Sequence, residues 1–184
     1  PFEETMGALV DIVRQGKALY VGISNYDAEQ SKEAIRILKK QNVHCLVHQA
    51  SYSMLNRWTE QGLMSVLEEE GVGMVAFSPL AQGMLTDKYL NGIPQDSRAA
   101  RATGFLQESA ITPEVVAKIR RLNELAKERN QTLAEMALAW LLRKKVVTSV
   151  IVGARNSEQL LTNLKALDNL EFSDEELAEI EKTI

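Results

Sequence analysis

The sequence predicts an α/β fold built around a parallel sheet, on two observations. Short apolar runs typical of strands alternate along the chain with amphipathic segments at helical spacing. The segments between successive strands are long enough to hold helices, which is how parallel strands are joined. The chain has 184 residues, a length typical of one domain. Of these residues, 45% are hydrophobic, which is enough for a substantial core.

The N-terminal part is predicted to start with a helix over 2–15, which ends at Gly16. The apolar run 18–23 follows, and it is expected to form a strand buried on both faces. Asp27, with Gln30 three residues later, is typical of a capping box and predicts that the next helix begins there.

The middle of the chain is predicted to contain a second strand at 45–49, a helix over 59–70 and a third strand at 72–77. The stretch from 79 to 111 has Gly, Pro, Asn and Asp but weak periodicity. It is therefore expected to be a long loop, and loops of this length are usually functional or disordered.

The C-terminal part is predicted to hold four amphipathic helices and a fourth strand over 148–152. Each helix has an N-cap signal, and the first also has Pro113 at its first helical position. The predicted N-cap residues are Thr112, Thr132, Asn156 and Ser173.

Four parallel strands make either a small open sheet or half of an eight-stranded barrel, which takes about 250 residues. The chain begins without Met, at what reads as the first turn of a helix. That start favours the half-barrel. We therefore expect a single partial domain over 1–184, with strands corresponding to about the fifth to eighth of a (β/α)8 barrel, a long loop and extra helices.

Composition excludes several classes of protein. A formal net charge of −4 argues against a protein that binds nucleic acid by bulk electrostatics. One cysteine excludes a disulfide framework and a cysteine zinc site, and two histidines leave little for any metal. No apolar run approaches the roughly 20 residues of a membrane span, and the N-terminus does not read as a signal peptide. We expect a cytoplasmic protein without metal, nucleic-acid or membrane partners.

Neutral polar side chains follow the first two predicted strands. In parallel α/β proteins, ligands bind at the carboxyl ends of the strands. Ser24, Asn25 and Gln49 lie at such ends and offer hydroxyl and amide groups, which suit a carboxamide ligand. Phe77, at the end of the third strand, offers a flat face for stacking.

The fourth predicted strand leads into a candidate phosphate site. Gly153 and Arg155 precede the helix that Asn156 caps, and a helix N-terminus beside an arginine suits a phosphate. Gln159 and Asn163 share one face of that helix, and amides can bind an adenine edge. Together these ends suggest a nucleotide with a carboxamide ring at one end and a phosphate at the other.

Each pattern also has an ordinary structural interpretation. A Ser-Asn pair after a strand is commonly a turn, an aromatic residue at a strand end commonly lies in the core, and a Gly-Ala-Arg-Asn turn commonly caps a helix. The chain has no G-x-G-x-x-G fingerprint.

A resemblance over nearly the whole chain adds weight to the nucleotide interpretation. Four motifs follow one another in the order found in the aldo-keto reductases, and the stretch 88–98 resembles the branch that contains potassium-channel β subunits and bacterial L-glyceraldehyde 3-phosphate reductases. The four motifs are Gly16–Tyr26, His48–Ser53, Phe77–Thr86 and Val152–Arg155.

The resemblance implies a (β/α)8 barrel that binds NADP(H) in an extended form without a Rossmann fold. Ser24, Asn25 and Gln49 would hold the nicotinamide carboxamide. Phe77 stands where the family places a stacking Tyr or Trp, and Thr162 stands where the family often has Glu. The pyrophosphate and ribose would be surrounded by Ser78, Pro79, Leu80, Gln82, Gly83, Lys88 and Arg98. The 2′-phosphate and adenine would be bound by Gly153, Ala154, Arg155, Gln159 and Asn163.

The catalytic Asp, Tyr, Lys and His of the family belong to the first half of the barrel, which the resemblance places upstream of Pro1. We therefore assign no catalytic residue in this chain and expect the segment alone to be inactive. His44 and His48 do not match the catalytic histidine, and His48 is expected to be a packed core residue.

The resemblance implies that the complete protein reduces small aldehydes, such as L-glyceraldehyde 3-phosphate or methylglyoxal, with NADP(H). An alternative is a channel-β-like regulatory subunit that senses NADP(H) with little turnover. A third possibility is a barrel without retained activity. By analogy with relatives, we expect a homo-oligomer.

Overall fold

The computed structural model describes residues 1–95, 99 and 106–184. The chain divides into two compact units, which we call the sheet unit and the helical unit. The sheet unit comprises 1–52, 57–77 and 144–151, and the helical unit comprises 53–56, 78–143 and 152–184.

The sheet unit is built on four parallel strands in the spatial order β1-β2-β3-β4. This confirms the prediction of an α/β fold with a parallel sheet. The strands are β1 (Val21–Ser24), β2 (Cys45–Ser51), β3 (Gly73–Phe77) and β4 (Val147–Ile151).

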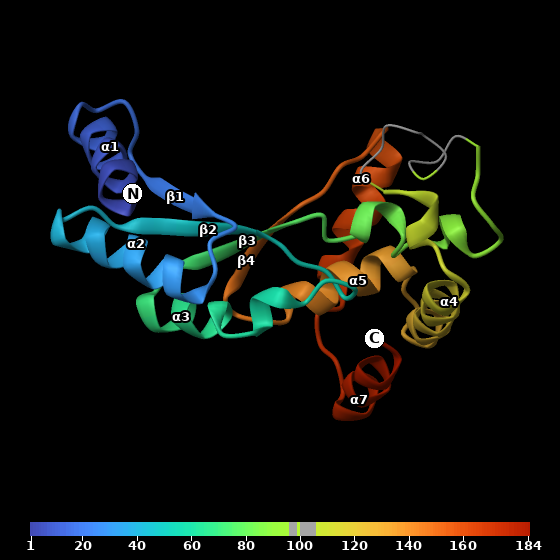
Figure 1. Cartoon of the computed structure of the whole chain (residues 1–184). Coiled ribbons are helices and arrows are strands. Elements are labelled where there is room, and N and C mark those ends of the chain that lie inside the picture. Colours follow the sequence, from blue (N-terminus) through green and yellow to red (C-terminus); the bar gives the residue numbers. More distant parts are fainter. Residues whose placement is uncertain (96–98, 100–105) are drawn as a thin grey trace. The chain divides into compact units, whose positions relative to one another are not determined.

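Helices cover one face of this sheet. They are α1 (Phe2–Arg14), α2 (Ala28–Lys40) and α3 (Leu63–Glu70), and Figure 1 shows α2 and α3 lying along the strands. Ile23, His48 and Met74 are register partners on three neighbouring strands, and all three are buried. They pack with the apolar side chains of the helices, which bury Ile35 and Leu67 completely.

The opposite face of the sheet is open in this unit. Ser24 and Gln49 are register partners, and both side chains are exposed. The expectation that the first strand is buried on both faces is therefore wrong for this structure, because the unit's helices pack on one face only. Gly22 lies on the open face, where an added Cβ would be 2.8 Å from the Val47 carbonyl oxygen. A glycine is required there by the close approach of β1 and β2.

Two predicted elements differ from the structure. The first strand begins at Val21 rather than at residue 18, and Leu19 is 84% exposed instead of pairing. The helix expected over 59–70 is two elements, a 3₁₀ turn η1 (Trp58–Glu60) and α3. Gly62 separates them with a φ of 99°, a left-handed conformation that a continuous helix cannot contain.

The helical unit contains four α-helices within the described residues. They are α4 (Pro113–Glu128), α5 (Leu133–Leu142), α6 (Ser157–Leu164) and α7 (Asp174–Thr183). The predicted long loop holds three short 3₁₀ turns in its described part, and a fourth follows α6. They are η2 (Ala81–Gly83), η3 (Asp87–Tyr89), η4 (Glu108–Ala110) and η5 (Lys165–Asp168).

The core of the helical unit centres on α5, whose residues from Met136 to Leu141 are all buried. All four predicted N-caps are present, since the side chains of Thr112, Thr132, Asn156 and Ser173 each accept a backbone N–H of the first turn. Two of these caps, at Thr132 and Ser173, are complete capping boxes.

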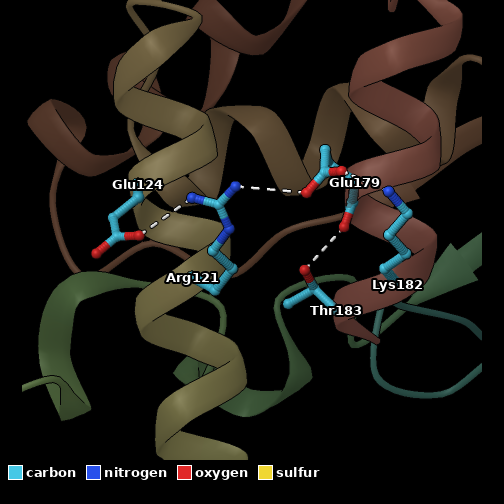
Figure 2. Close-up of polar contacts among 5 residues, drawn as sticks. All are labelled: Arg121, Glu124, Glu179, Lys182 and Thr183. Atoms are coloured by element: carbon cyan, nitrogen blue, oxygen red, sulfur yellow. Dashed lines mark hydrogen bonds and ion pairs between the residues drawn. The ribbon is translucent and has the colours of Figure 1, made fainter.

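Helices α4 and α7 are joined on their exposed sides by a charged cluster (Figure 2). Arg121 of α4 lies 3.3 Å from a carboxylate oxygen of Glu124 and 3.5 Å from one of Glu179. Within α7, Lys182 donates to Glu179, and the Thr183 hydroxyl donates to the Glu179 backbone oxygen. Every charged member of this cluster is substantially exposed, so each ion pair contributes little on its own.

Candidate functional site

The ends of β1 and β2 bring three predicted site residues together. Ser24 is the register partner of Gln49, and the Asn25 N–H donates to the Gln49 carbonyl oxygen at 3.0 Å. All three side chains are exposed. The carboxyl ends of these neighbouring strands therefore present one hydroxyl and two carboxamide groups. Each of these groups can both donate and accept hydrogen bonds.

Asn25 makes the bend that leads from β1 toward α2. Its φ is 56°, in the left-handed region that asparagine tolerates better than most residues. Two reciprocal hydrogen bonds hold the start of α2, which follows this bend. The Asp27 carboxylate accepts the Gln30 N–H at 2.9 Å, while the Gln30 side chain accepts the Asp27 N–H at 3.1 Å. This confirms the predicted capping box.

Tyr26 is anchored from the buried side of the sheet. His48 Nε2 lies 3.1 Å from the Tyr26 carbonyl oxygen, so this nitrogen carries the proton and donates. Burial lowers the pKa of His48, and the hydrogen bond to Tyr26 opposes that shift only in part. His48 is fully buried, as expected, but its link to Tyr26 was not predicted.

Phe77 ends β3 and is half-buried. Val75 is the register partner of Gln49, so Phe77, two residues further along, lies on the same open face as Gln49. The Phe77 carbonyl oxygen accepts the Tyr52 N–H at 3.2 Å, which ties the end of β3 to the residue that follows β2.

The turn after β3 belongs to the helical unit and has an unusual backbone. Ser78, Ala81 and Gln82 have φ values of 54°, 46° and 59°, and Gly83 has a φ of 101°. Non-glycine residues in this region of φ/ψ space are uncommon, and they cluster at functional sites. Pro79 is buried, and Leu80 is half-buried.

Lys88 follows in η3. The Thr86 hydroxyl donates to the Gly83 carbonyl oxygen at 2.7 Å and accepts the Lys88 N–H at 3.2 Å, so one side chain connects the turn to the lysine backbone. Arg98, also predicted to contact the cofactor, lies outside the described residues.

The segment that precedes α6 has the predicted helix-start geometry. The Asn156 side chain accepts the Gln159 N–H at 2.9 Å, and the Gln159 side-chain oxygen accepts the Arg155 N–H at 2.9 Å. These bonds fix the backbone that carries Arg155. Gly153, Ala154, Arg155 and Gln159 are exposed, while Thr162 and Asn163 are half-buried.

The structure therefore groups the predicted residues within each unit. The sheet unit holds Ser24, Asn25, Gln49 and Phe77. The helical unit holds the residues of the turn over 78–83, Lys88, and the segment over 153–163. Over the described parts of the chain, no group of three or more His, Cys, Asp or Glu side chains could hold a metal ion. Among the helices described, none is long and apolar enough to cross a membrane.

Comparison with known proteins identifies the family. The model of the Aldo/keto reductase family matches residues 1–184. The chain belongs to the aldo/keto reductase family. This confirms the resemblance seen in the four motifs, and it places the parallel strands within a (β/α)8 barrel fold.

Curated relatives of this aldo/keto reductase chain include two proteins named L-glyceraldehyde 3-phosphate reductase. One, from Escherichia coli O157:H7, is 49% identical, and one, from Escherichia coli strain K12, is 48% identical. A protein of Schizosaccharomyces pombe, provisionally named a voltage-gated potassium channel subunit beta, is 34% identical. Each match covers 100% of this chain and 54% of the relative, so the chain spans about half the length of these proteins.

A solved structure shows the same fold. It is a thermostable aldo-keto reductase in complex with the inhibitor epalrestat, 29% identical to this chain, with a TM-score of 0.73. The similarity covers 100% of this chain and 55% of the solved chain.

Proposed function

We propose that residues 1–184 form a single partial domain, the C-terminal half of an aldo-keto reductase barrel, and carry most of its NADP(H) site. In the complete protein this site serves the reduction of small aldehydes. The observation that carries the proposal is the grouping of Ser24, Asn25 and Gln49 at the carboxyl ends of β1 and β2.

The donor set of this group fits a nicotinamide. A carboxamide has one acceptor oxygen and two donor hydrogens, and the exposed hydroxyl and amide side chains can satisfy both kinds of group. Phe77 lies on the same open face and offers its ring for stacking. NADPH supplies the hydride for reduction, while these residues bind and orient its ring.

The helical unit supports the phosphate end of the proposal. The α6 N-terminus is capped by Asn156, and hydrogen bonds hold the Arg155 backbone at the start of the helix. A guanidinium beside a helix N-terminus suits a phosphate group, so we assign the 2′-phosphate to Arg155. The turn over 78–83, with Lys88 and Arg98, is proposed to surround the pyrophosphate and ribose. Gln159 and Asn163 are proposed to contact the adenine.

The Arg155→Glu variant tests this assignment. NADPH differs from NADH only by the 2′-phosphate, so the variant is expected to weaken NADPH binding by about tenfold or more and to leave NADH binding nearly unchanged. Calorimetric titration of the complete protein with both cofactors measures the two dissociation constants.

Lys118→Glu is the matched control for this variant. It makes the same change of charge at an exposed residue of α4, and neither cofactor should lose affinity. An equal loss of NADPH and NADH binding in Arg155→Glu would exclude Arg155 as the residue that recognises the 2′-phosphate.

The substrate class rests on the relatives. Two of them are named L-glyceraldehyde 3-phosphate reductase, and we propose a small aldehyde of this type, or of the methylglyoxal type, for the complete protein. The catalytic Asp, Tyr, Lys and His are proposed to lie upstream of Pro1. The segment alone is then expected to lack activity. The cytoplasmic location and the homo-oligomeric state stay predictions.

A regulatory subunit is the second candidate, favoured by the 34% identity to the protein provisionally named a channel subunit beta. The same residues would then bind NADP(H) for sensing. Steady-state turnover of small aldehydes by the complete protein separates the two, since a sensor should bind NADPH and turn over very slowly.

A further inference from the structure

The turn that carries Asn25 is held from the buried side of the sheet. His48 is fully buried and reaches the Tyr26 carbonyl oxygen with its Nε2 at 3.1 Å. The Ser31 hydroxyl, also fully buried, lies 3.4 Å from the same oxygen. Two side chains from different elements therefore donate to one carbonyl in the turn.

His48 and Gln49 are neighbours on β2 whose side chains point to opposite faces of the sheet. Gln49 is exposed on the open face, and its carbonyl oxygen accepts the Asn25 N–H. The turn is thus tied twice to the same short piece of β2, once through the backbone of Gln49 and once through the side chain of His48. These two bonds hold the backbone of Asn25 and Tyr26 against the part of β2 that carries Gln49.

We infer that His48 is a positioning residue for the nicotinamide end of the cofactor, because its bond to Tyr26 holds Asn25 in place relative to Gln49. This inference rests on the proposed function. Small errors in the placement of a bound group have large effects on binding and on hydride transfer.

The protonation of the His48 ring nitrogens agrees with this positioning role. Because the Tyr26 carbonyl oxygen accepts, Nε2 is protonated and Nδ1 is the unprotonated nitrogen. Among the described residues, Nδ1 has no hydrogen-bond partner. A buried imidazole with one unsatisfied nitrogen carries a free-energy penalty that an apolar side chain of similar size would avoid. Unlike an apolar side chain, however, the histidine can donate a hydrogen bond to the Tyr26 carbonyl oxygen.

Two variants at this position separate the hydrogen bond from simple packing. In His48→Gln the terminal NH₂ falls close to the position of Nε2 and can still donate to Tyr26. In His48→Leu the volume is similar and the donor is lost. Both are compared in the complete protein by calorimetry with NADPH and with adenosine 2′,5′-bisphosphate, which keeps the 2′-phosphate end and lacks the nicotinamide.

We expect His48→Leu to weaken NADPH binding by about tenfold, the effect of one lost hydrogen bond, and to leave adenosine 2′,5′-bisphosphate binding within about twofold. His48→Gln should restore NADPH affinity to within about twofold of the wild type. If His48→Leu does not fold, His48→Asn replaces it, because the shorter amide cannot reach the Tyr26 oxygen.

Three results would overturn the inference. NADPH affinity could be unchanged in the donor-free variant, or it could fall equally in the donor-free and glutamine variants. Affinity for both ligands could also fall together, which would indicate general loosening of the fold. A wild-type protein that binds neither ligand would refute the proposed function itself, and that outcome is distinct from the other three.

Discussion

A single buried histidine makes the stability of the sheet unit depend on pH. An exposed histidine titrates near pH 6.5. Burial lowers the pKa of His48 in the fold, so on acidification the unfolded chain takes up a proton before the native protein does. The contribution of His48 to the free energy of unfolding is therefore complete above about pH 6.5 and is lost as the pH falls through the native pKa.

The His48→Gln variant should show a smaller loss of stability on acidification, because glutamine does not titrate. Denaturant unfolding of both proteins at about pH 7.5 and about pH 5 measures this difference. Parallel losses in the two proteins would show that His48 does not titrate differently in the native and unfolded states.

Some site residues could be predicted from the sequence and others could not. Ser24, Asn25 and Gln49 directly follow or end apolar runs, so the topology of a parallel sheet brings them together. The left-handed backbone conformations of Ser78 and Gln82 could not be predicted from the sequence. Glycine is the residue type that indicates such a conformation, and neither residue is a glycine. Nor could the bond from His48 to Tyr26 be predicted, because it depends on the register between β2 and the turn.

One buried arginine joins the end of α4 to α7 and to the segment that leads into it. The Arg129 side chain is 3% exposed and lies 2.6 Å from a carboxylate oxygen of Glu176. It also donates to the Gln131 side chain at 2.9 Å and to the Glu171 carbonyl oxygen at 2.7 Å. Its guanidinium carbon is 3.7 Å from the centre of the Phe172 ring.

Arg129→Met should lower the free energy of unfolding by about 3 kcal/mol, because it removes the bonds to Glu171 and Glu176 and leaves the buried Gln131 acceptor without its donor. Arg121→Met, within α4, is the matched control. Arg121 also pairs with a glutamate of α7, but it is exposed, so we expect little change. Denaturant unfolding of both variants provides the comparison, and equal losses would contradict the role given to burial.

Helix starts marked by a capping box were more predictable than other element boundaries. Asp27, Thr132 and Ser173 are N-caps as expected, because a capping box is a local pattern that needs no tertiary information. The predicted helix over 59–70 failed at Gly62, whose left-handed conformation only the fold reveals. The first strand was predicted to start too early because the apolar Leu19 reads as strand but lies exposed.

We propose that residues 1–184, as the C-terminal half of an aldo/keto reductase barrel, carry most of the NADP(H) site. The open face of the sheet exposes Ser24 and Gln49 together with the apolar side chain of Ile151, the register partner of Phe77, which is 47% exposed. A face of mixed amide and apolar groups matches a nicotinamide ring, which has an apolar surface and a polar carboxamide.

The most direct measurement is a calorimetric titration of the complete wild-type protein with NADPH and, separately, with NADH. We predict saturable binding of NADPH, and binding of NADH that is weaker by about tenfold or more because the 2′-phosphate contact is lost. Failure of NADPH to bind at millimolar concentration, or equal affinity for the two cofactors, would contradict the proposed NADP(H) site.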